Sequence, residues 1–194
     1  GPFVARRLHS ETEAPAFEPL AEVRHVDAYL IDVFEHPNLK GAQPTYGSTY
    51  LDADEACKAA GKRLCTADEW EKACKGPTNN SFSYGDAYDP AVCGAGLEDR
   101  GYPSGDKADC RSKWGVGAFD MSGSFREWTA SAPTGKDNRR MVKGGLRHNP
   151  ERGTRCAFFT DESIGFKDGS MSFRCCRDVE APPVEHPDGE GEGE

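Results

Sequence analysis

The first long run of alternating apolar and polar positions lies at residues 23–34. It combines β-branched and aromatic residues with partial alternation, which is typical of a strand or of one arm of a hairpin. The following residues, Glu35-His-Pro-Asn38, predict a turn that closes this strand. Two more short strands are expected, at 140–145, which ends in a pair of glycines, and at 171–177.

A first helix is predicted after residue 50. Asp52 or Asp54 is a suitable N-cap, because a carboxylate oxygen accepts hydrogen bonds from the free N–H groups of the first turn. The pattern then continues through Ala60, and Gly61 is expected to end the helix because glycine adopts the left-handed conformation without strain.

A second helix is predicted with better-defined ends. Thr66-Ala-Asp-Glu69 is a capping box, and Gly76-Pro77 stops the helix. Within it, Trp70, Ala73 and Cys74 share one face at the spacing of successive helical turns. Cys74 should therefore point into the core beside Trp70.

Turn residues dominate the segment 77–115. A loop of this length inside a compact domain requires a clamp or a function, and Cys93 and Cys110 bracket its second half. Gly144-Gly145 precede a further loop, at 146–155, and an unusual backbone path of this kind often carries function.

The two ends of the chain differ in composition from the middle. Residues 1–22 mix charges with prolines, which predicts a linker or a strap along the domain, and residues 180–194 form an acidic tail that we expect to be disordered. One folded domain is left, at 23–179. Gly1-Pro2 resembles a protease scar, so we expect an N-terminal signal or anchor to have been removed.

The composition favours a loop-rich fold outside the nucleic-acid-binding classes. Hydrophobic residues make up only 36% of the chain, while Gly (22) and Pro (13) are numerous. The net charge of -9 argues against a nucleic-acid surface. No apolar run reaches the roughly 18 residues that a membrane-spanning helix needs.

Cysteine usage suggests an oxidising compartment. The eight cysteines are an even number without a CxxC pair or histidines at zinc-finger spacing, so we expect four disulfides and an extracytoplasmic protein. Spacing alone leaves about 105 connectivities open. The cysteines are Cys57, Cys65, Cys74, Cys93, Cys110, Cys156, Cys175 and Cys176.

The stretch Gly117 to Trp128 places two carboxylates, Asp120 and Glu127, around a glycine turn and ends in an aromatic residue. Oxygen ligands in a short loop suit a hard cation such as calcium. The same stretch can also anchor the core through Trp128. From its residues alone, the choice between a cation loop and a purely structural one stays open.

Four motifs in this order resemble the formylglycine-generating enzyme (sulfatase-modifying factor) family. They are Ala59 to Gly76, Gly115 to Trp128, Val142-Lys-Gly-Gly145 and Ser172-Phe-Arg-Cys175. The resemblance covers roughly residues 26–178. It implies an α+β fold of the C-type-lectin-like formylglycine-generating-enzyme type, which is loop-rich and stabilised by disulfides.

The resemblance also implies two disulfides by position, Cys57–Cys175 and Cys74–Cys156. We assign the other four cysteines to the pairs Cys65–Cys176 and Cys93–Cys110. The alternative that pairs Cys65 with Cys175 and Cys57 with Cys176 stays open, because Cys175 and Cys176 are adjacent.

In family members the loop at 120–127 binds a structural calcium ion. The matching positions are Asp120 and Glu127 through their side chains and Gly123 and Phe125 through main-chain carbonyls. Asp120 replaces the usual asparagine and adds a negative charge, whereas Arg126 brings a competing positive one.

The family's enzymes oxidise a cysteine of a client sulfatase with copper(I) held by two thiolates, which lie between the Gly-Gly and the Arg-Cys. Here that interval, 146–155, contains no cysteine. His148 and Glu151 offer one imidazole and one carboxylate, fewer than the three protein ligands of a catalytic metal site. We therefore expect no copper and no catalysis of that kind.

The same interval offers a polar, basic surface formed by Arg147, His148, Asn149 and Arg152. We expect it to recognise a protein or glycan on the surface of a bacterial cell, with Trp114 or Trp128 as possible aromatic neighbours. The alternative is an oxidoreductase related to formylglycine-generating enzyme with an altered metal site, acting on a protein or peptide.

Overall fold

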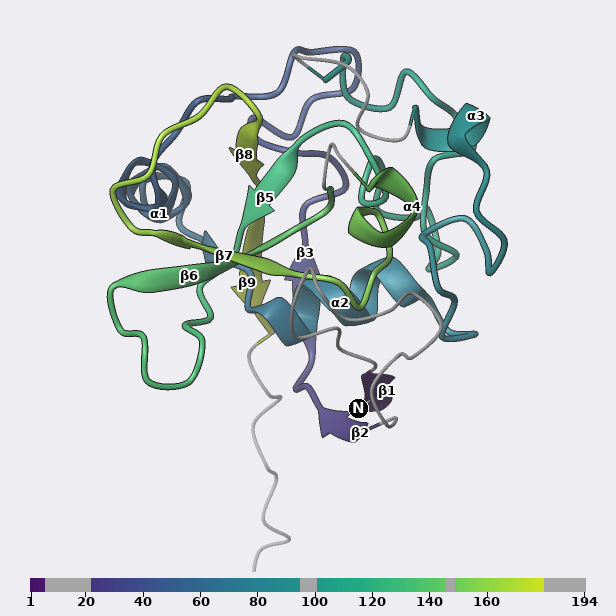
Figure 1. Ribbon diagram of the computed structural model, residues 1–194, viewed down its shortest axis with the longest axis horizontal. Helices are drawn as coiled ribbons and strands as arrows, with labels where there is room; N and C mark the ends of the chain where they lie inside the picture. Colours follow the sequence, from purple (N-terminus) through teal and green to yellow (C-terminus); the bar gives the residue numbers. More distant parts are fainter. Residues whose placement is uncertain (6–21, 95–100, 146–148, 180–194) are drawn as a thin grey trace, which may run out of the picture.

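A computed structural model describes residues 1–5, 22–94, 101–145 and 149–179, and the statements below refer to these residues. Three small sheets and four helices are connected by long loops, which agrees with the expected loop-rich α+β class. The strands of two sheets meet at the centre, where β8 and β9 follow each other along one line (Figure 1).

The first sheet is a two-stranded antiparallel ladder near the N-terminus, formed by β1 (Pro2–Ala5) and β2 (Glu22–His25). Part of the expected N-terminal strap is thus a strand, while residues 6–21 lie outside the described residues. The expected single strand at 23–34 is interrupted after β2, and its second part belongs to another sheet.

The second sheet has the order β3-β9-β4, with β3 (Tyr29–Ile31), β9 (Cys175–Asp178) and β4 (Arg63–Leu64) all paired antiparallel. β9 is the central strand, and both β3 and β4 pair with it. In register, Ile31 and Arg63 both lie opposite Cys176.

The third sheet has the order β7-β6-β5-β8. Its strands are β7 (Thr160–Ser163), β6 (Arg139–Lys143), β5 (Arg126–Trp128) and β8 (Met171–Phe173). β5 and β8 run parallel, and the other neighbours run antiparallel. The expected last strand at 171–177 is therefore two strands, β8 and β9, which belong to different sheets. Arg174 is the residue that connects them.

The first helix, α1 (Tyr50–Ala59), begins earlier than expected. Thr49 is its N-cap and forms a capping box with Asp52, so the expectation that Asp52 or Asp54 caps the helix is wrong. Asp52 occupies the third helical position and its carboxylate accepts from the Thr49 N–H at 3.0 Å.

The second helix, α2 (Ala67–Lys75), begins at the predicted capping box of Thr66 and Glu69 and ends before Gly76. The short helices α3 (Pro90–Cys93) and α4 (Pro150–Gly153) lie in segments for which the sequence indicated only loops. Among the described residues, none of the helices is long and apolar enough to cross a membrane.

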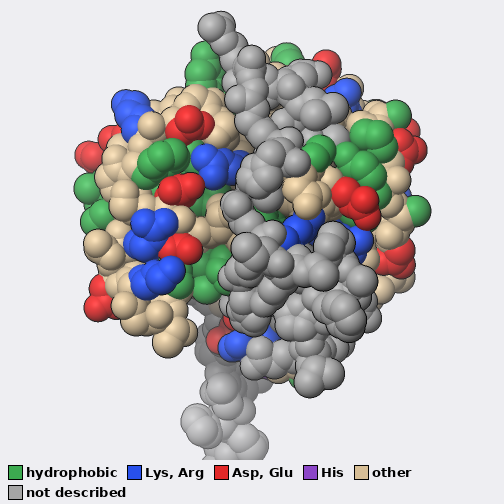
Figure 2. Space-filling model, viewed as in Figure 1, with side chains coloured by type: hydrophobic (Ala, Val, Ile, Leu, Met, Phe, Trp, Pro, Cys, Tyr) green, Lys and Arg blue, Asp and Glu red, His purple; other side chains and the backbone are tan. Residues whose placement is uncertain are grey.

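Two apolar clusters form the core. The first gathers α1, β4, β5, β6, β8 and β9, and includes Trp128. The second lies under α2 and includes Trp70, Ala73 and Cys74, which confirms the predicted inward face of that helix. Trp114, in contrast, is 43% exposed. The described charged side chains on the face in Figure 2 are interspersed in sign rather than gathered into a basic patch.

Candidate functional site

Four disulfides join all eight cysteines. The pairs are Cys57–Cys175, Cys65–Cys176, Cys74–Cys156 and Cys93–Cys110. They are the pairs assigned from the sequence rather than the alternative that exchanges the partners of the two adjacent cysteines. Three of them link residues 82 to 118 positions apart: two join α1 and the end of β4 to β9, and the third joins α2 to the turn after α4.

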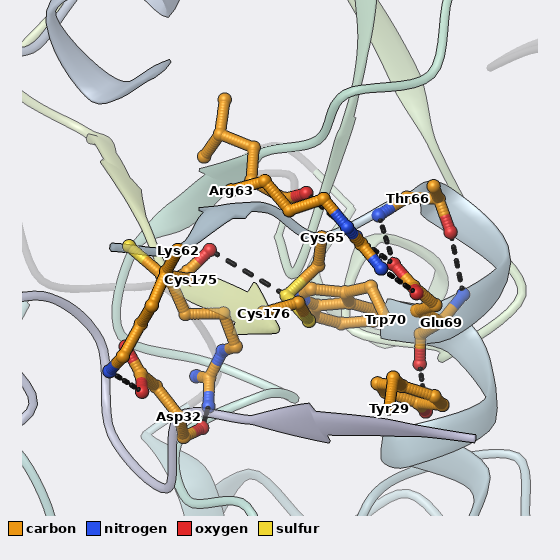
Figure 3. Close-up of a disulfide and its surroundings, with 12 residues drawn as sticks. Tyr29, Asp32, Lys62, Arg63, Cys65, Thr66, Glu69, Trp70, Cys175 and Cys176 are labelled. Carbon is orange, nitrogen blue, oxygen red and sulfur yellow. Dashed lines mark hydrogen bonds and ion pairs between the residues drawn. A yellow bond between two sulfur atoms is a disulfide. The ribbon is translucent and has the colours of Figure 1, made fainter. Parts of the chain in front are cut away.

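The adjacent cysteines have different partners because successive side chains of a strand point to opposite faces. Cys175 pairs with Cys57 of α1. Cys176 pairs with Cys65, the residue after β4, as Figure 3 shows. β9 is thereby bonded covalently on both of its faces, and each of these four cysteines is almost fully buried.

The loop that carries the candidate cation site, 117–128, follows a tight backbone path. Asp120 and Ser124 both have positive φ, at 65° and 64°. Gly123 approaches the 93–94 turn so closely that a Cβ there would lie 2.4 Å from the Cys93 carbonyl oxygen. The loop is thus packed against the Cys93–Cys110 clamp, and Asp120 Oδ2 accepts a hydrogen bond from the Gly105 N–H at 2.8 Å.

Glu127 is bound on both carboxylate oxygens by protein donors. Arg174 donates from Nε to Oε2 and from Nη2 to Oε1, each at 2.7 Å, and Trp70 Nε1 donates to Oε2 at 2.8 Å. Both charged side chains are fully buried. This is the bidentate geometry in which a guanidinium binds a carboxylate most specifically.

Two further carboxylates share this buried region. Glu35 accepts from the Phe125 N–H through Oε1 at 3.4 Å, while its Oε2 and Asp120 Oδ1 have no hydrogen-bond partner among the described residues. Burial raises the pKa of Glu35 well above its usual value, and the charges of Glu127 and Asp120 raise it further. Burial also raises the pKa of Asp120 to about 6.

Three carboxylates therefore face one guanidinium in this buried region. A buried anion is costly unless a proton or a cation compensates it. The raised pKa values of Glu35 and Asp120 follow chiefly from this burial, and the neighbouring carboxylates raise them further.

The family model of the sulfatase-modifying factor enzyme 1-like domain (FGE-sulfatase) matches residues 31–179, most of the chain. The chain belongs to this FGE-sulfatase family. Two curated relatives are named inactive C-alpha-formylglycine-generating enzyme 2. The one from Mus musculus is 26% identical over 161 residues, and the one from Bos taurus is 27% identical over 165. These alignments cover 72% and 73% of the chain but only 50% and 52% of the relatives, so it spans about half their length.

Solved structures share the fold at low sequence identity. PvdO from Pseudomonas aeruginosa superposes with a TM-score of 0.61 at 15% identity, covering 92% of both chains. Treponema denticola variable protein 1 gives a TM-score of 0.60 at 13% identity, covering 91% of this chain and 93% of that one. These similarities establish the FGE-like architecture and leave the activity to be argued from the residues.

In this FGE-sulfatase domain the residues expected to bind calcium fit that ion only in part. Asp120 fits, because Oδ1 is a buried oxygen without a partner, and Glu35 Oε2 offers a second such oxygen. Glu127 does not fit as a free ligand, because Arg174 and Trp70 occupy it. Within the described ranges, no group of three or more His, Cys, Asp or Glu side chains is arranged to hold a metal.

The interval 146–155, where the sequence offers no cysteine, is described only from Asn149 onward. Residues 146–148, and with them Arg147 and His148, lie outside the described residues. Asn149 caps α4, its Oδ1 accepting from the Arg152 N–H at 3.3 Å. Glu151 forms an ion pair with Arg155 at 3.3 Å instead of pointing to a metal site.

Arg152 differs from the expectation. It is only 2% exposed, and its guanidinium lies over the ring of Phe158 at 5.5 Å. This contradicts its expected place on an exposed binding face, because α4 turns the side chain into the domain. Its neighbour in sequence, Glu151, is exposed.

Sequence reasoning did not identify Glu35 and Arg174 as parts of the site. Glu35 looked like the start of a turn, and Arg174 looked like one position of a continuous strand. A usable signal was present in Ser172-Phe-Arg-Cys175, because an arginine between two core residues must find a buried anion.

Proposed function

We propose that this domain is a non-catalytic binding module of the FGE-sulfatase family that acts outside the cytoplasm. The observation that carries the proposal is the state of the cysteines. All eight lie in disulfides, and the interval between Gly145 and Cys156 contains none. Copper(I) of the family's type is held by soft thiolate ligands, and this chain has no free thiol to supply them.

The disulfides also support the compartment. Four disulfides in one domain form and persist in oxidising surroundings, and in the cytosol they would be subject to reduction. The names of the two curated relatives describe inactive proteins, which supports a non-catalytic role here as well.

The proposed partner is a protein or glycan on a bacterial cell surface, recognised through the exposed part of the segment around α4. Arg147 and His148 are the residues of the expected face that remain as candidate contacts, with Asn149 shaping the loop by capping α4. Arg152 supports this loop from inside, because it is buried against Phe158.

In the same proposal, calcium is a structural cofactor of the 120–127 loop. Asp120 would hold the ion through its side chain, with main-chain carbonyls of Gly123 and Phe125, and Glu35 supplies a second carboxylate oxygen nearby. Glu127 would act by holding Arg174 rather than by binding the ion. Bound calcium would supply the positive charge that the carboxylate-rich region lacks.

The non-catalytic assignment is tested with the intact protein. A cysteine-containing sulfatase peptide is incubated with the protein and copper(I), and an active formylglycine-generating enzyme serves as the positive control. We expect mass spectrometry to find no conversion of cysteine to formylglycine, and titration of the denatured protein to find no reactive thiol. Conversion above the copper-only control, or two reactive thiols per chain, would support the oxidoreductase alternative instead.

The binding face is tested separately by a double variant, Arg147→Ala with His148→Ala, against a matched control, Lys40→Ala. Lys40 is an exposed basic residue away from α4 in the sequence. We expect binding to a glycan array or to extracted surface proteins to be lost in the double variant and kept in the control. Equal binding by both variants would remove this face from the proposal.

A further inference from the structure

A pocket of about 390 Å³ lies at the N-terminal end of the 117–128 loop, and none of its lining residues belongs to α4. It opens between β3, the surface of α2 and the turn at 114–118. Its volume is at the lower end of the roughly 300–1,000 Å³ typical of ligand sites, so it suits one bulky side chain or a small ring. Gly117 and Ala118 of that loop line it, but none of the carboxylates and carbonyls proposed to hold calcium does.

The floor of the pocket is part of the second core cluster. Ala73 and Ala118 are both 4% exposed, and Ile31 packs against the same cluster. The rim is formed by Trp114 and Val116, which are unusually exposed for large apolar side chains, at 43% and 71%. A group entering here would bury apolar surface of the rim and continue the core.

Trp114 is held in place although it is exposed. Its Nε1 donates to the Lys72 carbonyl at the end of α2, at 3.1 Å. The turn that carries it is fixed by Gly117, whose N–H donates to the Trp114 carbonyl, and whose φ of 83° a larger residue would adopt only with strain. A rigid exposed indole is a preorganised contact for an apolar group.

The main chain beside the pocket is the free edge of β3. The Ala28 carbonyl accepts a hydrogen bond from the Val179 N–H, and the Asp32 N–H donates to the Cys175 carbonyl, both on the β9 side. In the alternating antiparallel pattern, the N–H and C=O groups of Tyr29 and Ile31 therefore point away from β9. Both residues line the pocket. Among the described residues, neither forms a backbone hydrogen bond on that side, and only the Val33 carbonyl is used, by the Phe119 N–H.

The side chain of Tyr29 lies between β3 and α2. It crosses to α2, where its hydroxyl donates to the Glu69 carbonyl at 2.7 Å, and Figure 3 shows it lying against that helix. The tyrosine therefore closes the inner end of the gap between β3 and α2. At the outer end of this gap, the free edge of β3 lies beside the pocket.

Charge near the pocket is mainly positive, in contrast to the net charge of -9 of the chain. Arg111 and Lys113 are exposed on either side of the buried Ser112, and the Lys113 backbone packs against Gly76 at the end of α2. Lys72 lines the pocket itself and donates to the Gly1 carbonyl at 2.6 Å. The acidic residue among the lining side chains is the exposed Asp27.

We propose that the free edge of β3 binds an extended peptide that carries one bulky apolar side chain and flanking acidic residues. The peptide adds a strand beside Tyr29 and Ile31, as in other cases of β-strand addition. Its apolar side chain enters the pocket under Trp114, and its carboxylates face Arg111 and Lys113. This site is separate from the α4 face, so it stands or falls independently of the proposed function.

The test uses a synthetic heptapeptide of alternating glutamate and valine with one central phenylalanine, acetylated and amidated at its ends. Trp70 and Trp128 are fully buried, so Trp114 dominates acrylamide quenching of tryptophan fluorescence in the folded protein. We expect the peptide to protect Trp114 from quenching in a saturable manner. A version with lysine in place of glutamate should bind at least about tenfold more weakly because the nearby side chains of Arg111 and Lys113 are basic.

Two protein variants make the test specific. Val116→Glu places a charge at the pocket rim, and Leu51→Glu places the same charge on α1, where Leu51 is 56% exposed. Because both positions are exposed, both variants should fold. We expect Val116→Glu to weaken peptide binding at least about tenfold and Leu51→Glu to leave it unchanged.

Backbone pairing is tested with a peptide whose alternate amides are N-methylated, which removes the donors that β3 would use. We expect its binding to be lost. Equal binding of the methylated peptide would overturn strand addition, and equal weakening by both variants would place the peptide elsewhere. Absence of protection by the unmodified peptide, protection by free indole alone, or a dimer abolished by Val116→Glu would also overturn the proposal.

Discussion

Arg174 and Glu127 form a fully buried bidentate ion pair that joins the connection between β8 and β9 to the centre of β5. The remaining donors of the guanidinium bind the main-chain carbonyls of Asp32 at 3.2 Å and Phe119 at 2.9 Å. One side chain thus connects four segments of the chain. The motif that was expected to end the domain as a simple strand holds the two central sheets together.

Removing this arginine should be strongly destabilising. Arg174→Ala leaves the Glu127 carboxylate buried without its cation, and breaking a buried pair in this way costs about 3–5 kcal/mol. Urea denaturation followed by circular dichroism measures the change in free energy of unfolding. Arg177→Ala, at an exposed position of the adjoining strand β9, is the matched control and should change it by less than about 0.5 kcal/mol. Equal effects at both positions would contradict the role given to the pair.

Calcium removal should lower the melting temperature. A ligand that binds only the folded state stabilises it by mass action, so EDTA should lower Tm and excess calcium should restore it. Asp120→Ala should make Tm insensitive to calcium, whereas Asp109→Ala, an exposed acid, should keep the response. The measurement is differential scanning calorimetry. An unchanged Tm after complete metal removal from the wild-type protein would rule out a structural calcium ion.

The disulfides should differ in their contribution to stability according to the loops they close. Cys57–Cys175 closes 118 residues and Cys93–Cys110 closes 17. On chain-entropy grounds, replacing both cysteines by alanine should cost about 1.7 kcal/mol more for the first pair than for the second. Chemical denaturation of the two double variants gives this difference. A larger loss for Cys93–Cys110 would show that its clamp on the 120–127 loop outweighs loop entropy.

The cap of α1 can be tested against the sequence-based expectation. Thr49→Ala removes the side chain that accepts from the Asp52 N–H at 3.1 Å and should cost about 1 kcal/mol. Asp54→Ala removes only an exposed ion pair with Lys58, which is worth less than about 0.5 kcal/mol. If thermal denaturation gives the reverse order, Asp54 and not Thr49 determines where the helix begins.

Local signals allowed prediction of much of the fold. The capping box of Thr66 and Glu69 was predictable because it depends on residues three positions apart. The start of α1 was not, because Thr49, Asp52 and Asp54 are all acceptable caps and only the preceding backbone conformation decides between them. The family resemblance supplied two of the four disulfide assignments, because spacing alone leaves many connectivities open, and the other two were assigned among the four cysteines that remained.

The candidate site was harder to predict because its parts are distant in sequence. Asp120 and Glu127 were visible in one short motif, but the partner of Glu127 lies 47 positions later and Glu35 lies 85 positions before Asp120. Arg152 was misplaced because a basic loop residue is exposed in most proteins. Its burial follows from the short helix α4, which no strong local pattern predicts.

The central position of β9 has a consequence for the order of events during synthesis. Residues 171–178 supply the partners of β3, β4 and β5 and the second cysteine of two disulfides. Nearly all of the polypeptide must therefore leave the ribosome before these strands and cystines can form. Until then, Cys57 and Cys65 lack their native partners, Cys175 and Cys176.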